Sequence, residues 1–458
     1  MLNTYNKRLN AKMAYDADPT KWLSTSVNVL VNHTWGRYTP EDGGGQEARR
    51  TMIEMLPWLP VYEPGTNKYT TSTSPSLSGF NLEGMSNPVF ILNDQRRMKY
   101  NTQIFGNAAL TFHLAEGLDL KTQFGLDSHN ITYRGYSSVG LNNISMPNGW
   151  AEYENWNTLY WQEETYLTYN KVLGDHRINA MAGLSWQERT YRRNKSKTEG
   201  FSDDFYEDYN MIVGTTPKSP ESDWTRWAMN SYFLRFAYTY KDRYSATVTG
   251  RIDGSSKFGD NNKYAFFPSV AAAWNISSEE FMESQTNYLD MLKIRLSWGS
   301  NGNQAINPYQ TLDRLTLTNY IWGDNGTVVN GAYLPTNGVG NPNLRWETSR
   351  TINAGIDFSF FNGRLSGNID VYVVNTSDLL MSRTVPYMNG YKSIMDNVGK
   401  TRNKGVEIAL NSVNFQNNDF RWTTNVNFSL NRDKIIELRG DGKDDITNKW
   451  FIGEPLRV

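Results

Sequence analysis

The stretch AGIDFSFFNGRLSGNIDVYVV, Ala354 to Val374, alternates apolar and polar side chains on both sides of a turn at Asn362-Gly363. One set of alternate positions is apolar: Ile356, Phe358, Phe360, Leu365, Ile369 and Val371. The other set is polar or small: Gly355, Asp357, Ser359, Ser366, Asn368 and Asp370. A period of two marks a strand whose faces meet different surroundings, and Asn-Gly between two such runs signals a hairpin. The sequence therefore predicts a β-hairpin, and the surroundings of its two faces decide the function.

The same alternation recurs along the whole chain. It is clearest in the runs Leu9–Tyr15, Leu23–Val31, Ala108–Leu126, Ile178–Trp186, Tyr232–Val248, Val270–Ile276, Leu292–Trp298 and Val406–Leu430. We count about fourteen strands, each longer than the five or six residues usual in globular proteins. No repeat of about 20 to 50 residues is visible, which argues against propellers and solenoids.

The connections between these strands are of two kinds. Tight connections are predicted near Asp18, Glu116, Asp175, Asp242, Gly363 and Asn417. Long connections are predicted at His33–Lys99, Asn130–Asn157, Tyr191–Ala228, Ser300–Trp346 and Asn375–Arg402. Ser277–Asp290 interrupts the short side and is expected to hold a helical turn. Short turns that alternate with long loops are typical of outer-membrane barrels.

Composition excludes several classes of protein. Lys and Arg number 46 against 47 Asp and Glu, so nothing indicates the basic face that nucleic acid requires. Cysteine is absent, which excludes disulfides and thiolate sites in this chain. No apolar run approaches the roughly 18 residues of a membrane helix. The N-terminus lacks the apolar core of a signal peptide, so the chain is either cytosolic or an internal piece of a longer protein.

A soluble β-sandwich would also alternate, with its apolar face turned inward, but three features favour a barrel. The strands reach the nine to eleven residues that cross a bilayer, the connections are lopsided, and tryptophans gather at strand ends, where amphipathic rings prefer the membrane interface. These tryptophans are Trp22, Trp274, Trp298, Trp346 and Trp422. We therefore predict an all-β fold, a transmembrane antiparallel β-barrel with apolar faces toward lipid and polar faces toward a water-filled lumen.

Motifs for catalysis or metal binding are weak. The stretch DGSSKFGD, Asp253 to Asp260, lacks the spacing and closing Glu of an EF-hand, and we interpret it as a strand-to-loop corner in which Gly254 and Gly259 allow unusual backbone angles. RGDGKDD, Arg439 to Asp445, is interpreted as a solvated loop rather than a calcium site. The histidines have no zinc-binding spacing, and no Walker loop or nucleophile elbow appears. We therefore predict no enzyme activity, no catalytic or metal site and no cofactor.

Six tryptophans are expected to lie off the strands: Trp58, Trp150, Trp156, Trp224, Trp227 and Trp322. They could pack the long loops together, which is the reading we favour. They could instead form flat platforms for sugar rings or contacts to a protein partner, where Trp is a frequent anchor. Composition does not separate these alternatives.

Four stretches resemble the SusC/RagA family of TonB-dependent outer-membrane transporters. They are RIDGSSKFGDNNKYAFFPSVAAAWNIS (251–277), LKIRLSWGSNGNQ (292–304), NPNLRWETSRTINAGIDFSFFNGRLSGNIDVY (341–372) and NVGKTRNKGVEIALN (397–411). The resemblance implies a barrel of about 22 strands in the outer membrane. It also implies import of oligosaccharides or peptides, a SusD-like surface lipoprotein as lid, and energy supplied by TonB.

The resemblance also has gaps. The family's signal peptide, plug and TonB-binding segment would precede Met1, and a terminal aromatic strand is not found in the closing sequence WFIGEPLRV. We therefore expect residues 1–458 to form part of a barrel domain, an open sheet of about fourteen strands whose first and last strands each lack a neighbour. Two alternatives stay open: a TonB-linked receptor for metal chelates, and a secreted carbohydrate-binding β-protein.

Overall fold

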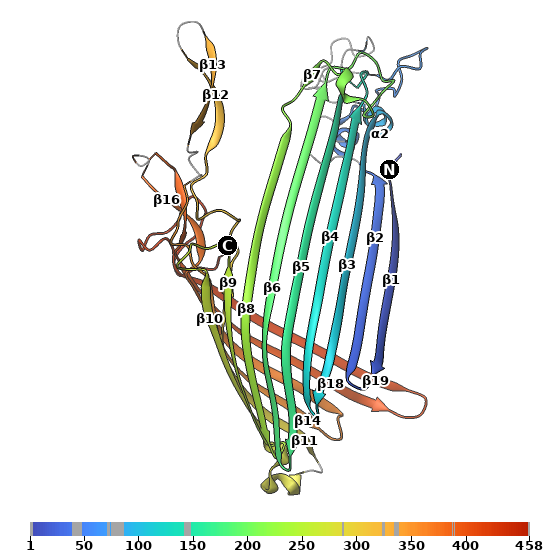
Figure 1. Ribbon diagram of the computed structural model, residues 1–458. Coiled ribbons are helices and arrows are strands. Elements are labelled where there is room, and N and C mark those ends of the chain that lie inside the picture. The colour runs from blue at the N-terminus through green and yellow to red at the C-terminus, as the bar shows by residue number, and fades with distance from the viewer. Residues whose placement is uncertain are drawn as a thin grey trace.

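The computed structural model describes residues 3–38, 48–70, 74, 87–141, 148–285, 288–322, 326–333, 339–386, 388 and 390–456. One antiparallel sheet of fifteen strands dominates these residues (Figure 1). Fourteen of its strands pair in chain order, and the short β7 (Thr216–Pro217) pairs with β6 at its side. Their bounds are β1 (Tyr5–Thr20), β2 (Leu23–Arg37), β3 (Gln95–Ala115), β4 (Leu118–Ser137), β5 (Trp150–Leu173), β6 (His176–Glu199), β8 (Glu221–Tyr240), β9 (Tyr244–Ser255), β10 (Tyr264–Asn275), β11 (Leu289–Asn303), β14 (Glu347–Phe360), β15 (Leu365–Ser377), β18 (Lys400–Gln416) and β19 (Arg421–Glu437).

The sheet is open, as the sequence predicted, with β1 and β19 at its two ends. Within the described residues β1 pairs only with β2. The free side of β19 is met near its end by a returning segment. The N–H of Ile435 donates to the carbonyl of Glu454, and the N–H of Gly453 donates to the carbonyl of Ile435, each at 2.9 Å.

The hairpin of residues 354–374 forms as predicted. Ile356 lies opposite Ile369 and Asp357 opposite Asn368, so the apolar set shares one face and the polar set the other. The turn places Asn362 at φ 55° and Gly363 at φ 77°, in the left-handed region that Asn and Gly adopt most easily. The carboxylate of Asp290 on β11 fixes this turn, because it accepts the N–H of Asn362 at 3.1 Å and that of Gly363 at 2.8 Å.

Long and short connections gather at opposite ends of the sheet (Figure 1). The long-loop end carries α1 (Ala48–Glu54), α2 (Pro88–Asp94), η2 (Met211–Val213) and two separate hairpins, β12 (Thr316–Trp322) with β13 (Thr327–Tyr333) and β16 (Leu380–Thr384) with β17 (Ser393–Asn397). The helical turn predicted in Ser277–Asp290 is confirmed by η3 (Ile276–Ser278) and η4 (Glu280–Gln285) at the short-turn end. The turn predicted near Asp18 lies further on, because β1 continues to Thr20.

Several strands run further than predicted. β5 and β6 span 24 residues each, so much of the predicted loops Asn130–Asn157 and Tyr191–Ala228 is strand. Apolar alternation fades in these extensions, where the backbone pairing continues and cross-strand ion pairs join the side chains. Lys195 pairs with Glu152 at 3.2 Å, for example. A sequence pattern that rests on apolar periodicity does not detect such strands.

A buried apolar cluster at the long-loop end consists of Phe258, Phe267, Ile306, Leu344 and Trp346. Trp346 is 6 % exposed and its ring lies 5.1 Å from that of Phe258, so the prediction that it marks a membrane interface is wrong.

The corner at Asp253–Asp260 is confirmed, since β9 ends at Ser255. The role predicted for its glycines is wrong. Neither Gly254 nor Gly259 has a positive φ. Each is needed for space, because a Cβ would collide with the Tyr264 ring at Gly254 and with the carbonyl of Pro342 at Gly259.

Residues 440–444 of the loop Arg439–Asp445 are exposed, as predicted for a solvated loop, whereas Asp445 is buried. Asp445 is 4 % exposed and pairs with Arg439, and it accepts the side-chain N–H of Asn448 at 2.8 Å. Burial alone would raise the pKa of the Asp445 carboxyl, but these partners together hold it below its ordinary value.

Candidate functional site

The two faces of the sheet differ in chemistry. Neighbouring strands carry the row Ala354, Val371, Val406 and Leu430 on one face, and the next row on that face is Ile356, Ile369, Ile408 and Phe428. Between them lies a row on the other face, Gly355, Asp370, Glu407 and Ser429. Val371 is 48 % exposed and Phe428 53 %, so the apolar face is not covered by the chain itself. In a membrane barrel such a face meets lipid and the polar face lines the lumen.

Aromatic rings mark the short-turn boundary of the apolar face. Trp22 stacks on Phe112 with ring centroids 6.2 Å apart, and Trp274 stacks on Tyr244 at 6.4 Å. Trp422, at the start of β19, is 56 % exposed. These positions suit the belt of amphipathic rings that flanks a membrane-spanning band.

An ion triad crosses three strands of the polar face. Arg295 on β11 donates to Asp357 of β14 at 2.8 and 2.9 Å and to Asp370 of β15 at 3.0 Å. Asn368 donates to the same oxygen of Asp370 at 2.8 Å. One guanidinium thus satisfies two carboxylates in a fork geometry that Lys cannot provide. The triad braces the wall and leaves little unpaired charge.

Nearer the long loops, the polar face carries a mixed aromatic and hydrogen-bonding surface that we call the Trp227 platform: Tyr160, Gln162, Gln187, Trp227 and Lys257. The hydroxyl of Tyr160 lies 2.8 Å from an amide oxygen of both Gln162 and Gln187. The ring centroids of Trp227 and Tyr160 are 6.3 Å apart, and Lys257 Nζ lies 5.2 Å from the centroid of the Trp227 ring. A cavity of about 260 Å³ adjoins Tyr160.

Burial shapes the electrostatics of the platform. Desolvation, with the Arg189 cation as a second cause, lowers the pKa of Lys257 from its ordinary value. The Lys257 ammonium also donates to the carbonyl of Gln304 at 3.3 Å. Flat rings beside amide groups can stack on a sugar or aromatic ring and bond hydroxyl or peptide groups at its edge.

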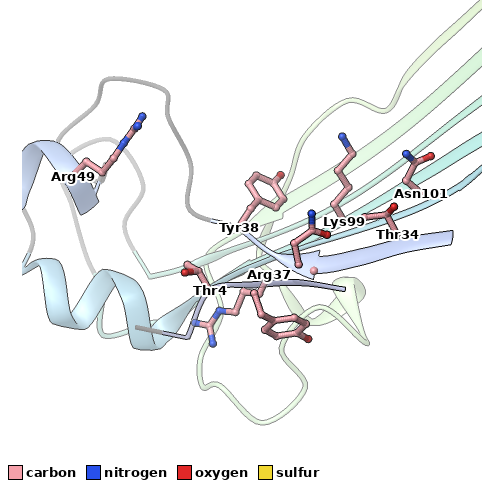
Figure 2. A pocket seen from close by; sticks show the side chains of 10 residues that line it. Thr4, Thr34, Arg37, Tyr38, Arg49, Lys99 and Asn101 are labelled. Carbon is pink, nitrogen blue, oxygen red and sulfur yellow. The ribbon is translucent and has the colours of Figure 1, made fainter. Parts of the chain in front are cut away.

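A larger cavity of about 550 Å³ lies at the long-loop ends of β1, β2 and β3 (Figure 2). Figure 2 shows Tyr38, Lys99 and Asn101 extending to one side, whereas Arg37 turns to the other. Arg37 donates to the carbonyls of Leu92 and Asn93 at 2.8 Å and so caps the last turn of α2. The residues that line the cavity are mostly neutral, and three of them are cations, Arg37, Arg49 and Lys99.

The prediction that six tryptophans lie off the strands is right only for Trp58. Trp150 and Trp156 lie on β5, Trp224 and Trp227 on β8, and Trp322 on β12. The error follows from the strand extensions described above. The side chain of Trp322 falls outside the described residues.

Four of these tryptophans have well-defined surroundings. Trp150 is 4 % exposed with Arg97 5.0 Å from its centroid, which fits the packing interpretation. Trp156 donates its indole N–H to Glu154 at 2.7 Å. Trp224 is half exposed on the opposite face from Trp227 and stacks on Tyr309 at 6.5 Å. Trp58 is 54 % exposed in a long connection. The structure therefore spreads the six over the long-loop end and brings them into no single cluster.

Sequence reasoning missed the partners of Trp227. Tyr160, Gln162 and Gln187 occupy the polar alternate positions of β5 and β6, a signal that was present in the sequence. Their meeting with Trp227 depends on the register of three strands, and Lys257 comes from a loop beyond a fourth.

Within the described residues no group of three or more His, Asp or Glu side chains is placed to hold a metal ion. The same part of the chain holds no helix of the length and apolarity needed to cross a membrane.

The family model for TonB dependent receptor-like β-barrels matches residues 14–457. The chain belongs to the TonB-dependent receptor β-barrel family. This confirms the resemblance to SusC/RagA transporters and places the chain in the outer membrane as a β-barrel protein. The family is one of receptors and transporters.

Similar proteins support this placement among TonB-dependent receptors. TonB-dependent receptor P3 of Formosa agariphila is 32 % identical over 97 % of this chain and 44 % of its own length. TonB-dependent receptor SusC of Bacteroides thetaiotaomicron is 34 % identical over 61 % of this chain and 27 % of its own. The structure of the RagAB peptide importer in its closed-closed state superposes with a TM-score of 0.81 at 25 % identity, covering 99 % of this chain and 50 % of that one. The chain thus spans less than half the length of these curated relatives.

Proposed function

We propose that the full-length protein imports nutrients, oligosaccharides or peptides, across the outer membrane with a SusD-like surface lipoprotein and energy from TonB. Residues 1–458 would supply part of the barrel wall, its polar lining and the outer loops. The plug and the TonB-binding segment would lie outside these residues. The proposal assigns transport, not catalysis, to the chain.

The Trp227 platform is the observation that carries the proposal. It stands on the polar face, combines stacking surface with amide groups, and lies toward the long loops where a ligand enters. Such mixed surfaces fix the orientation of a small ligand. The similarity to a protein named a peptide importer and to SusC supports a transported organic nutrient more than a metal chelate.

The remaining tryptophans are assigned to other contacts. We propose that Trp58 and Trp322, both in connections at the long-loop end, contact the lipoprotein, whereas Trp224 on the outer side packs against Tyr309. Trp150 and Trp156 are held by Arg97 and Glu154 and would shape the rim around the ligand.

The test compares two tryptophans of one strand. Trp227→Ala in the full-length protein should lower uptake of a labelled oligosaccharide or peptide about fivefold, because one stacking contact is lost. Trp224→Ala, three residues away on the opposite face, is the matched control for folding. It should leave uptake of the same labelled ligand largely unchanged. Uptake is measured in cells with and without TonB and the neighbouring lipoprotein. Uptake that is unchanged in cells lacking TonB and in cells lacking the lipoprotein would refute the proposed transport. Equal uptake by the Trp227→Ala and Trp224→Ala variants would refute only the role of the Trp227 platform.

A further inference from the structure

Five cations stand together on the apolar face, at the long-loop ends of β14, β18 and β19. Register places Arg350, Asn375, Arg402 and Lys434 in one row across four adjacent strands. The next row toward the membrane is Ile352, Val373, Lys404 and Arg432. All five cations are exposed. We call this set the cation patch: Arg350, Arg402, Lys404, Arg432 and Lys434.

The patch borders the band that faces lipid. The row below it is entirely apolar, Ala354, Val371, Val406 and Leu430. Trp298 of β11 lies opposite Ile352 and so belongs to the lower row of the patch; it is 37 % exposed. An exposed Trp at the end of an apolar band marks the membrane–water boundary. The patch therefore lies at the height of lipid headgroups on the long-loop side.

None of the five cations has a carboxylate within 4.0 Å among the described residues. Some other cations on the same face are paired: Arg134 binds Asp208 at 2.6 Å, and Arg226 binds Glu188 at 2.6 Å. Glu437, at the end of β19, pairs with Lys400 instead. Arg402 is oriented by the side-chain oxygen of Asn375, which accepts its Nε–H at 2.7 Å.

We propose that the cation patch binds the phosphate groups of an anionic lipid in the outer leaflet. Adjacent strands are about 4.8 Å apart, so the patch offers several cations within reach of one headgroup. Guanidinium groups bind phosphate through paired N–H donors, and cations beside a membrane surface attract anionic lipid. The acyl chains would then lie against Ile352, Val371 and their neighbours. The proposal rests on the outer-membrane placement and not on which nutrient is transported.

The experiment uses the full-length protein in detergent micelles. Three patch cations are neutralised, Arg402→Gln, Lys404→Gln and Arg432→Gln, and binding of fluorescent lipopolysaccharide is titrated. The matched control neutralises three cations of the polar face, Lys12→Gln, Lys293→Gln and Arg421→Gln. Heat-modifiable gel migration verifies that each barrel is folded. If the triple variant does not fold, Lys404→Gln and Arg432→Gln are measured singly.

The patch variant should bind lipopolysaccharide about tenfold more weakly, each single variant should also weaken it, and the control should match the unaltered protein. Dephosphorylated lipopolysaccharide should bind poorly to all of them. Equal binding by the patch variant, or an equal loss in the control, overturns the proposal. Undiminished binding of the dephosphorylated lipid would assign the affinity to acyl chains instead. Displacement by millimolar inorganic phosphate would show a free-anion site and overturn the lipid assignment.

Discussion

Ile369 and Asn368 are neighbours in the chain with opposite surroundings. Ile369 lies opposite Ile356 and Ile408 in the middle of the apolar band, whereas Asn368 donates to Asp370 on the polar face. This alternation was predictable from sequence, because a period of two assigns every residue of a strand to a face. The partners of Asn368 could not be predicted from sequence, because the triad around Arg295 depends on the register of three strands.

Ile369→Arg should destabilise the folded full-length barrel by about 2–4 kcal/mol, since a cation near the bilayer midplane loses its hydration. Asn368→Arg is the paired control and should cost much less, because it faces a polar lumen with Asp357 and Asp370 nearby. Denaturant titration in lipid vesicles gives both values. Equal costs for the two variants would mean that the faces are assigned wrongly.

The observed strands and turns match the sequence-based predictions closely within the membrane band and less closely beyond it. The hairpin at residues 354–374, the short turns and the η3–η4 connection were predictable from alternation and turn residues. The long-loop ends of β5 and β6 were not, because regular apolar alternation fades there and charged residues such as Lys195 and Glu152 pair across the strands. Trp150 and Trp156 of β5 and Trp224 and Trp227 of β8 were assigned to loops because these strands run further than predicted, and Trp322 lies on β12 within a long connection.

The η3–η4 connection is tied to the sheet by one carboxylate. Glu279 accepts the hydroxyl of Tyr244 at 2.5 Å and the indole N–H of Trp274 at 2.9 Å, and it pairs with Arg243 at 3.1 Å. The bonds from Tyr244 and Trp274 hold the pKa of the Glu279 carboxyl below its ordinary value. The carboxylate therefore stabilises the folded state above its ordinary pKa, and that contribution is lost as pH falls through the lowered, folded-state pKa.

Glu279→Gln should lower the thermal unfolding midpoint of the full-length protein in detergent at pH 7. The difference from the unaltered protein should shrink as the pH is lowered through the acid range below the ordinary Glu pKa of about 4.3, because protonation then removes the carboxylate from the unaltered protein as well. Glu280→Gln removes a neighbouring, far more exposed acid at 3.3 Å from Arg243 and serves as control. A Glu279→Gln deficit that stays the same size from pH 7 to pH 3 would contradict the assigned role.

The described residues form an open, curved sheet with long connections at one end and short turns at the other (Figure 1). Alternation was enough to predict the number of its main strands, and the resemblance to a larger family barrel predicted that the sheet is open. Trp346 shows where the prediction stopped: its place beside Phe258 and Phe267 depends on how three long connections pack at the long-loop end. Loops of this kind carry little periodicity, so their packing is set by contacts far apart in sequence.

The orientation in the membrane follows from the same asymmetry, because outer-membrane barrels keep short turns in the periplasm and long loops outside. Residues 1–458 contain no cysteine, so an introduced thiol is the only one in this part of the protein. Ile212 on η2 is 88 % exposed at the long-loop end, and the side chain of Glu116 is 91 % exposed in the turn between β3 and β4. In the full-length protein on intact cells, a membrane-impermeant maleimide should label Ile212→Cys, whereas Glu116→Cys should react only after the outer membrane is opened. The protein without an introduced thiol gives the background. Labelling of Glu116→Cys on intact cells would invert the topology, and the cation patch would then face the periplasmic leaflet, where lipopolysaccharide does not reside.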